Sequence, residues 1–328
     1  MPPTLTIVTP AYNEAQNLPV LYERLLEAIE SLDVDLEWVI VDDHSHDETP
    51  AVVARLVTQD ARVRGVRLAR NCGSHTALLC GLDQARGDCA IIMAADLQDP
   101  PEEIPRLLES WRRGAHVVWA VRARREGVGR IRLAFARLYY FLMRRLSALR
   151  SMSATGADFF LIDRRVIDAL RTFRERHVSV LALIGWMGFR QTSIEYTKQA
   201  RLHGRSGWTL GKKLKLLVDS VTSFTYFPIR LMSYLGFLTA TGGFGYAVVV
   251  MISALRGHPP TGWASLMMVV LLLGGVQMVM LGVLGEYLWR ALDESRARPR
   301  YIVEAMIQRG GSEWTESAFI PPPRSVHS

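Results

Sequence analysis

The sequence lacks the glycine-rich motifs with which many proteins hold phosphates. No GxGxxG follows the first strand pattern, and no Walker A motif occurs anywhere in the 328 residues. The turn after that strand is Pro-Ala-Tyr-Asn-Glu (10–14), whose side chains are too bulky for the backbone to approach a pyrophosphate. A dinucleotide-binding turn is therefore excluded here. A diphosphate bound by this chain needs another source of positive charge, and a divalent cation is the usual one.

Cysteine is scarce, and no secretory leader is visible. Cys72, Cys80 and Cys89 have no close metal-ligand spacing and are odd in number, which fits reduced thiols in a cytosolic domain. The chain enters a strand pattern at Thr4 without a basic or long apolar leader. We therefore expect no signal peptide.

Charged residues are missing from two long apolar stretches, 231–255 and 263–285. Each exceeds the roughly 20 residues that cross about 30 Å of hydrocarbon as a helix. A pair of buried core helices is the alternative, but such helices seldom stay uncharged for so long, and the glycines suit packing between membrane helices. We predict a two-span transmembrane hairpin at 229–289. Basic residues crowd its outer flanks, so we expect both termini to be cytoplasmic.

Positive and negative charges are unevenly distributed along the chain. Residues 1–60 contain 12 acidic and 2 basic residues, whereas residues 121–150 contain nine arginines and one glutamate. A basic region close to membrane spans favours anionic or phosphate-bearing lipid as a partner. We therefore expect the membrane as a partner and no nucleic acid.

Strand and helix patterns alternate over the first 125 residues. Short apolar, β-branched runs occur at 5–9, 36–41, 63–69, 89–95 and 116–121, and helical patterns such as 17–31 lie between them. This alternation predicts an α/β fold, an open and mostly parallel Rossmann-like sheet with flanking helices. In such sheets, ligands bind beyond the carboxyl ends of the strands.

Polar residues gather where the predicted strands end. The tips read PAYNE (10–14), DDHS (42–45), RNCG (70–73), DLQD (96–99) and RARR (122–125). Turns and helix caps also favour Asp, Asn and Ser, which accounts for Asp47 and Asn71 but not for all the tips together. Asp96 and Gln98 offer a carboxylate and a neutral oxygen two residues apart, in the style of a Mg²⁺ site.

Three further segments complete the expected organisation. Residues 131–149 and 208–227 are basic, aromatic and amphipathic, which beside a membrane span favours interfacial helices over surface helices of the domain. We predict a cytoplasmic domain at 1–228, the hairpin at 229–289, and a cytoplasmic C-terminal tail at 290–328. The Gly, Pro and Ser content beyond Arg309 predicts that the end of this tail is flexible.

Five motifs together resemble the family 2 glycosyltransferases of GT-A fold. They are PAYNE (10–14), VDDHS (41–45), RNCGS (70–74), the pair Gly87-Asp88, and ADLQDPPE (95–102). More narrowly, residues 4–230 look like the polyisoprenyl-phosphate glycosyltransferases, which include dolichyl-phosphate mannose synthase and the bacterial bactoprenol glucosyl and aminoarabinose transferases. The two-span hairpin that follows is similar to the bacterial members. Five motifs in order at successive strand ends make the resemblance specific.

The resemblance implies roles for residues on the donor side. Residues that would bind the donor are Pro10, Tyr12, Glu14, Asp43, Asp96, Gln98 and Arg122. The first three would line the nucleotide pocket, and Asp43 would hydrogen-bond the base. Asp96 and Gln98 would hold Mg²⁺ or Mn²⁺ against the diphosphate, while Arg122 would meet a phosphate of the donor or of the acceptor.

The resemblance also implies residues on the acceptor side. Asp158, in the Gly-Ala-Asp-Phe sequence at 156–159, would lie near the acceptor, and it is a catalytic candidate together with Asp96. The stretch Arg-Leu-His-Gly-Arg-Ser (201–206) is similar to an RxxGxSK motif on a mobile loop. Arg201 and Ser206 would then bind the lipid phosphate.

The chain departs from the family pattern at two positions that bear on the chemistry. Ala94 stands where the family commonly has the first aspartate of Asp-Ala-Asp, and Gly207 stands where it has lysine. A phosphate monoester has a second pKa of about 6, so the acceptor is mostly a dianion at neutral pH and needs no strong base. The loss of one carboxylate therefore weakens the metal site without removing the mechanism. Arg205, Lys212 or Lys213 could replace the missing lysine.

We therefore expect a metal-dependent, inverting hexosyltransferase of the bacterial inner membrane. It would move a sugar from a nucleotide diphosphate, with UDP favoured, to a polyprenyl phosphate such as undecaprenyl phosphate at the cytoplasmic face. A GDP-mannose donor is one alternative, and a non-catalytic membrane scaffold that keeps the GT-A fold is another. A processive synthase fits less well, because the Q-x-x-R-W motif is missing. The sequence leaves open the sugar, the metal and whether the chain forms a homo-oligomer.

Overall fold

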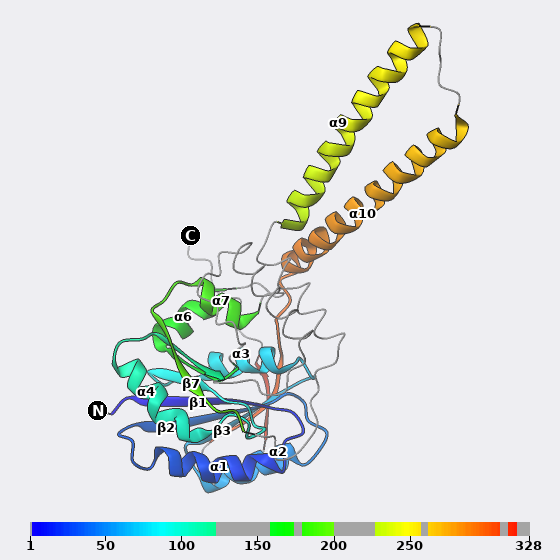
Figure 1. The fold of residues 1–328 in the computed structure, drawn as a ribbon. Helices are drawn as coiled ribbons and strands as arrows, with labels where there is room; N and C mark the ends of the chain where they lie inside the picture. The colour runs from blue at the N-terminus through cyan, green and yellow to red at the C-terminus, as the bar shows by residue number, and fades with distance from the viewer. Residues whose placement is uncertain are drawn as a thin grey trace, which may run out of the picture. The chain divides into compact units, whose positions relative to one another are not determined.

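The computed structural model describes residues 2–122, 158–173, 179–199, 227–256, 262–308 and 314–319 (Figure 1). The chain divides into two compact units, one comprising Met1–Thr209 with Pro299–Ser328 and the other Leu210–Arg298. The two segments predicted to be interfacial helices, 131–149 and 208–227, lie outside the described residues except for Phe227, where a long helix begins.

The first unit is built on a mixed sheet. Its described strands are β1 (Thr4–Ala11), β2 (Asp35–Asp42), β3 (Val63–Leu68), β4 (Cys89–Ile92), β5 (Val117–Arg122), β6 (Phe160–Asp163), β7 (Gln191–Tyr196), β8 (Val303–Ile307) and β9 (Thr315–Phe319), in the order β7-β5-β6-β4-β1-β2-β3-β8-β9. The centre, β4-β1-β2-β3, is parallel as predicted. The sheet is mixed rather than mostly parallel, because β6 pairs antiparallel with β4 and β5 and because β8 and β9 add an antiparallel edge.

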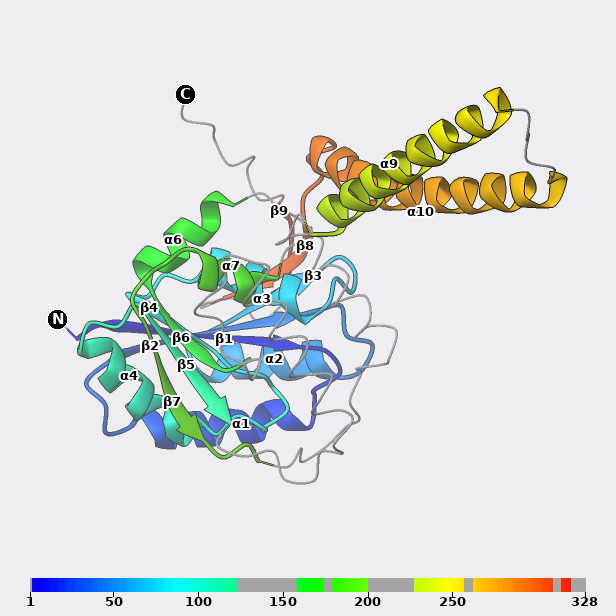
Figure 2. The same ribbon diagram turned by 45° about the horizontal axis from the view of Figure 1, so that its top comes forward.

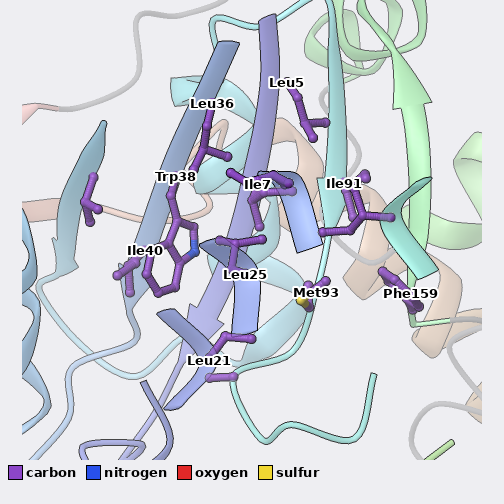
Figure 3. Packing of buried hydrophobic residues seen from close by; sticks show 14 of the residues in the cluster. Leu5, Ile7, Leu21, Leu25, Leu36, Trp38, Ile40, Ile91, Met93 and Phe159 are labelled. Carbon is purple, nitrogen blue, oxygen red and sulfur yellow. The ribbon is translucent and has the colours of Figure 1, made fainter. Parts of the chain in front are cut away.

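Helices cover both faces of this sheet (Figure 2). The helices described in the first unit are α1 (Asn17–Ile29), α2 (Thr49–Gln59), α3 (Ser74–Gln84), the 3₁₀ turn η1 (Pro101–Glu103), α4 (Ile104–Arg112), α6 (Arg164–Thr172) and α7 (Val180–Trp186). Helices α1, α2 and α4 pack on one face, and α3, α6 and α7 on the other. Figure 3 shows Leu21 and Leu25 of α1 against Ile7 and Trp38 of the central strands.

The fourth strand ends earlier than the sequence predicts. The apolar run 89–95 suggested a strand to Ala95, but β4 stops at Ile92. One more bond follows, from the Met93 N–H to the Val8 carbonyl at 3.0 Å, and the chain then turns through Leu97, whose φ is 59°. Asp96 and Gln98 consequently lie on a tight turn just beyond the strand rather than on the strand itself.

Asp163 links the end of β6 to the start of α6. Its carboxylate accepts from the backbone N–H of Arg165 at 3.0 Å, from the Arg165 side chain and from Trp111 Nε1 at 2.8 Å. Burial raises the pKa of Asp163, but the bonds from Arg165 and Trp111 outweigh it, so that the net pKa is lowered. The carboxylate therefore stabilises the folded state in its ionised form.

Replacing this carboxylate should lower stability in a pH-dependent way. We expect Asp163→Ala to lower the melting temperature by about 2–4 °C at neutral pH, because a lost helix cap costs about 1 kcal/mol. A lowered folded-state pKa contributes stability above the ordinary value of about 4 and loses it as pH falls through the folded-state value. Thermal unfolding of both proteins should therefore show a difference that shrinks below about pH 4. Asp163→Asn, which keeps the cap, should fall in between, and a difference independent of pH would contradict this assignment.

The second unit contains two long apolar helices, α9 (Phe227–Leu255) and α10 (Trp263–Ser295). Both contain windows long and apolar enough to cross a membrane, Ile229–Ser253 and Leu266–Ser295, and neither window is buried. The helices approach closely at Gly236, where a Cβ atom would lie 3.2 Å from the Met280 side chain. A pair of buried core helices, the alternative considered from the sequence, does not describe them.

Two strands follow α10, and one of them, β9, lies beyond Arg309, where the sequence predicts a flexible tail. Residues 303–307 form β8 against β3, and residues 315–319 form β9 beside it. Buried apolar residues alternate along β8, where Val303, Ala305 and Ile307 point into the core. This strand depends on pairing with β3, a partner far away in the sequence that a local pattern does not reveal, and it was therefore not predicted.

Candidate active site

Strand topology brings the polar tips together at one edge of the sheet. The ends of β1 and β2 are paired, Ala11 with Asp42, and β4 ends beside Val8 of β1. Strand β6 runs the other way, so its beginning at Phe160, just after Asp158, meets the end of β4. The end of β5 reaches the same edge, where Arg122 pairs with Tyr196 of β7. Residues from six of the described strands thus converge.

The turn after β4 carries the predicted metal ligands. The side chain of Asp96 is 7% exposed, and its Oδ1 accepts from the Gln98 backbone N–H at 3.2 Å. Gln98 is half-buried, and its carbonyl accepts from the Gln199 N–H at 2.9 Å. This turn is therefore fixed internally and also tied to the segment that follows β7. Leu97, between Asp96 and Gln98, adopts the left-handed conformation that the tight turn requires.

A buried carboxylate that the sequence analysis did not single out lies next to this turn. Asp99 is fully buried, its Oδ1 accepts from the Tyr196 hydroxyl at 2.6 Å, and the Lys198 ammonium lies 3.7 Å away. Burial raises the pKa of Asp99, and the charges of Asp96 and Asp158 raise it further, against Lys198 and Tyr196. Oδ2 of Asp99 has no hydrogen-bond partner in the described part of the chain. Asp99 therefore interacts electrostatically with both Asp96 and Asp158.

Arg122 and Asp158 face each other across the end of β5. Their side chains form a long ion pair of 3.9 Å, in which Arg122 is 27% exposed and Asp158 is 61% exposed. Burial raises the pKa of Tyr196, and a hydrogen bond with Arg122 opposes the rise. Arg122 thus connects Tyr196 to Asp158, and the looseness of the ion pair leaves its guanidinium available to an anion.

His75, at the start of α3, is a second group that the sequence analysis passed over. Burial lowers its pKa, and the charge of Asp158 partly offsets this. Its Nδ1 is buried without a hydrogen-bond partner among the described residues. A neutral imidazole with a free nitrogen therefore borders the site on the Asp158 side.

The tip of β2 holds Asp43 in a defined orientation. Its two carboxylate oxygens accept from the backbone N–H groups of Cys72 and Gly73, at 2.7 and 2.8 Å. Burial raises the pKa of Asp43, and these two bonds oppose the rise. Each oxygen keeps a second lone pair, so that the carboxylate can also accept a bond from a ligand. The next residue, His44, adopts φ = 59°, a left-handed conformation that non-glycine residues seldom adopt.

The turn after β1 interlocks with the tip of β2. The Asn13 N–H donates to the Ser45 hydroxyl, and Asn13 Oδ1 accepts from the His46 N–H at 3.0 Å. Pro10 pairs in register with Val41, and Glu14 accepts from the Asn17 side chain at 2.5 Å. Tyr12 is exposed, with its ring edge-on to His46 at 6.4 Å between centroids. An open aromatic face and a fixed turn are what a bound base requires.

The structure thus gathers seven of the predicted residues along one edge and adds four more. Those gathered are Pro10, Tyr12, Asp43, Asp96, Gln98, Arg122 and Asp158, and Glu14 belongs to the same turn as Tyr12. Arg201 and Ser206 lie outside the described residues, as do Arg205, Gly207, Lys212 and Lys213. The additions are His75, Asp99, Tyr196 and Lys198. Of these four, only Asp99 lies within a motif noted in the sequence, ADLQDPPE (95–102).

One recognised motif lies away from this edge. Asp88 accepts from the Thr4 N–H at 2.8 Å, at the opposite end of β1, and the Gly87 N–H donates to the Thr6 hydroxyl. A Cβ atom at Gly87 would fall 2.5 Å from the Thr4 carbonyl oxygen, so only glycine fits. This pair serves the fold rather than the chemistry.

A mixed sheet with carboxylates and an arginine at its tips, together with two apolar helices in the same chain, is typical of a membrane-associated glycosyltransferase of GT-A type. Residues 6–171 match the model of glycosyl transferase family 2, and residues 227–290 match that of the GtrB C-terminal hairpin. The chain therefore belongs to glycosyl transferase family 2.

Curated relatives extend over almost the whole chain. A bactoprenol glucosyl transferase of Shigella phage SfV is 36% identical over 93% of this chain and 99% of its own. The undecaprenyl-phosphate 4-deoxy-4-formamido-L-arabinose transferase of Yersinia enterocolitica is 34% identical over 95% of each chain. Among solved structures, mannosyltransferase PcManGT of Pyrobaculum calidifontis, in complex with GDP-Man and Mn²⁺, is 18% identical with a TM-score of 0.50, over 90% of this chain and 87% of its own. That structure supports the fold.

Proposed function

We propose that this chain transfers a sugar from a nucleoside-diphosphate donor, with a UDP-sugar favoured, to a polyprenyl phosphate. The observation that carries the proposal is the connected set Asp96, Asp99, Tyr196, Arg122 and Asp158 at one edge of the sheet. The set combines buried carboxylates, which can hold a cation, with a partly exposed guanidinium, which can pair with phosphate oxygens. A bound diphosphate needs both sources of positive charge. Relatives named for bactoprenol and undecaprenyl phosphate support the lipid acceptor.

The reaction needs little covalent chemistry from the protein. An oxygen of the acceptor phosphate attacks the anomeric carbon and forms a new C–O bond. The bond from that carbon to the donor diphosphate breaks, and the nucleoside diphosphate leaves with the electron pair, which inverts the configuration. The acceptor is mostly a dianion at neutral pH, so no proton has to be removed. Arg122 would bind phosphate oxygens and hold the reactants in line.

The residues at the β4 turn fit a hard divalent cation such as Mg²⁺ or Mn²⁺. No group of three or more His, Cys, Asp or Glu side chains with metal-binding geometry occurs in the described residues, so Asp96 and Gln98 would supply the protein ligands. Mg²⁺ commonly takes one or two carboxylates and fills its other positions with water and phosphate oxygens. When bound, the ion supplies positive charge against the diphosphate. Ala94, half-buried beside this turn, contributes no ligand.

We place the reaction at the cytoplasmic face of the bacterial inner membrane, with both termini in the cytoplasm. The two apolar helices and the basic residues that flank them support this orientation. A soluble nucleotide sugar would reach the acidic edge of the sheet from the cytoplasm, and the lipid phosphate would come from the bilayer.

A donor screen tests the proposed function directly. The purified full-length protein, in lipid nanodiscs with undecaprenyl phosphate, is incubated with UDP-glucose, other UDP-sugars and GDP-mannose, and the lipid product is read by mass. We expect one UDP-sugar to add its glycosyl mass to the lipid and to release an equal amount of UDP. Chelation with EDTA should abolish the product, and Mg²⁺ or Mn²⁺ should restore it. A product from GDP-mannose alone would favour the mannosyl alternative, and the absence of any product would favour a scaffold.

A further inference from the structure

The strand after the membrane hairpin is an integral part of the first unit. The Tyr301 hydroxyl donates to Asp83 at 2.6 Å, and Trp314 Nε1 donates to the Pro50 carbonyl at 3.2 Å. At Gly65 of β3, a Cβ atom would lie 2.6 Å from Ile307 and 2.9 Å from Trp314, so these side chains occupy the space that any larger residue would need. Figure 2 shows β8 alongside β3. Strand β8 is therefore firmly docked, and its side chains are held in place.

One side chain of β8 points at the tip of β2. Glu304, 45% exposed, pairs with Arg67 Nε at 2.9 Å and lies 3.6 Å from the His44 ring nitrogen Nδ1. These two contacts join a residue from the end of the chain to residues 237 and 260 positions earlier. His44 is the residue directly after Asp43, the predicted partner of the donor base.

Arg67 distributes its donors over three acceptors. Its Nη1 pairs at 2.5 Å with Asp42, which is fully buried, and its Nη2 donates to the Ser45 carbonyl at 3.3 Å. The Nε contact with Glu304 fixes the plane of the guanidinium, because three bonds on three nitrogens leave the group a single orientation. Asp42 and Ser45 bracket Asp43 and His44, so this one arginine holds both ends of the turn that carries Asp43.

His44 gives a second link to the same turn. Its Nδ1 lies 3.0 Å from the Leu68 carbonyl, and its backbone is left-handed at φ = 59°. A non-glycine residue in that conformation costs roughly 1–2 kcal/mol, so the turn depends on its surroundings to hold its shape. Glu304 contacts both the arginine and the histidine that supply this support.

We propose that Glu304 is a positioning residue for the donor nucleotide. It acts through Arg67 and His44 on the turn that presents Asp43, and it does not touch the reacting atoms. The inference rests on the proposed function, because it takes the edge at Asp43 as the donor's base pocket. It assigns to β8, whose sequence follows α10 by seven residues, the role of completing that pocket.

A specific kinetic signature follows from this role. The base contact contributes to binding the donor equally in the ground state and the transition state, so loosening it raises KM and leaves kcat unchanged. We expect Glu304→Gln to raise the donor KM, and the dissociation constant of UDP, by about two- to fivefold, the range for partly exposed ion pairs. The KM for the lipid acceptor should not change.

The experiment compares matched variants of the full-length protein. UDP binding is measured by calorimetry, and transfer is measured with the donor identified in the screen, for the wild type, Glu304→Gln, Glu304→Asp and Glu316→Gln. Glu316 lies on β9 next to Ala305 and forms no ion pair in the described part of the chain, so its variant controls for a lost surface charge. Glu304→Asp should recover part of the affinity, because it restores the charge at a shorter reach.

The outcomes separate this inference from the proposed function. A wild type that binds no nucleotide of the panel would overturn the proposed function and this inference with it. A wild type that binds UDP, together with a Glu304→Gln protein of equal affinity, would overturn the inference alone. A purely structural role would lower the melting temperature and reduce kcat while KM stays unchanged, and that pattern would also overturn it.

Discussion

Asp96→Asn is expected to reduce sugar transfer at least about 100-fold, with the loss in kcat. The substitution keeps the size of the side chain and an acceptor for the Gln98 N–H, so the turn should remain folded. It removes the one carboxylate that we assign to the cation. Ala94, two residues before Asp96, offers no second carboxylate that could take its place.

The measurement is the rate of lipid product formation over a range of Mg²⁺ and Mn²⁺ concentrations. Asp33→Asn serves as the control, since Asp33 is exposed in the loop between α1 and β2, away from the edge that carries the site. Equal melting temperatures for the two variants would place the loss in catalysis. If Asp96→Asn retained full, Mg²⁺-dependent transfer, the assignment of Asp96 as metal ligand would be wrong.

Local patterns in the sequence were enough to predict the centre of the sheet. Apolar runs of four to eight residues, separated by helical periodicity, located β1, β2, β3, β4 and β5, and helix 17–31 corresponds to α1 at Asn17–Ile29. The polar tips followed, because parallel strands with crossover helices end at one edge. The strands, the helix and the polar tips depend on residues that are neighbours in the chain, so a single sequence is enough to predict them.

Features that depend on distant partners were not predictable. The Tyr196 hydroxyl meets Asp99 across 97 residues, and Arg67 meets Glu304 across 237. Strand β7 is largely exposed, so its sequence carries little apolar alternation, and the antiparallel insertion of β6 breaks the crossover rule that orders the rest. Asp99 illustrates the limit, because a fully buried carboxylate and a solvated turn residue look the same in sequence.

A second large effect is expected at the other end of the sheet, in stability rather than in catalysis. Glu37 of β2 is buried and accepts from the Thr6 hydroxyl at 2.7 Å, from Arg64 Nη1 at 2.6 Å and from the Arg86 N–H at 2.9 Å. Glu37→Ala would leave the buried guanidinium of Arg64 without its counter-charge. Breaking a buried pair in this way costs about 3–5 kcal/mol. The melting temperature should therefore fall by roughly 10 °C.

A double-mutant cycle tests the physical reason for this loss. We expect Glu37→Met and Arg64→Met each to be destabilising alone, and the protein with both changes to be clearly more stable than the sum of these two single changes predicts, because no buried charge is left unpaired. Thermal unfolding of the full-length protein gives the three differences. Transfer measured below the melting temperature should stay near the wild-type rate, since this pair lies by the start of β1 and the active site lies beyond its end. If the stability losses of the two single variants simply add in the double variant, each side chain contributes by packing alone, and there is no interaction energy between Glu37 and Arg64.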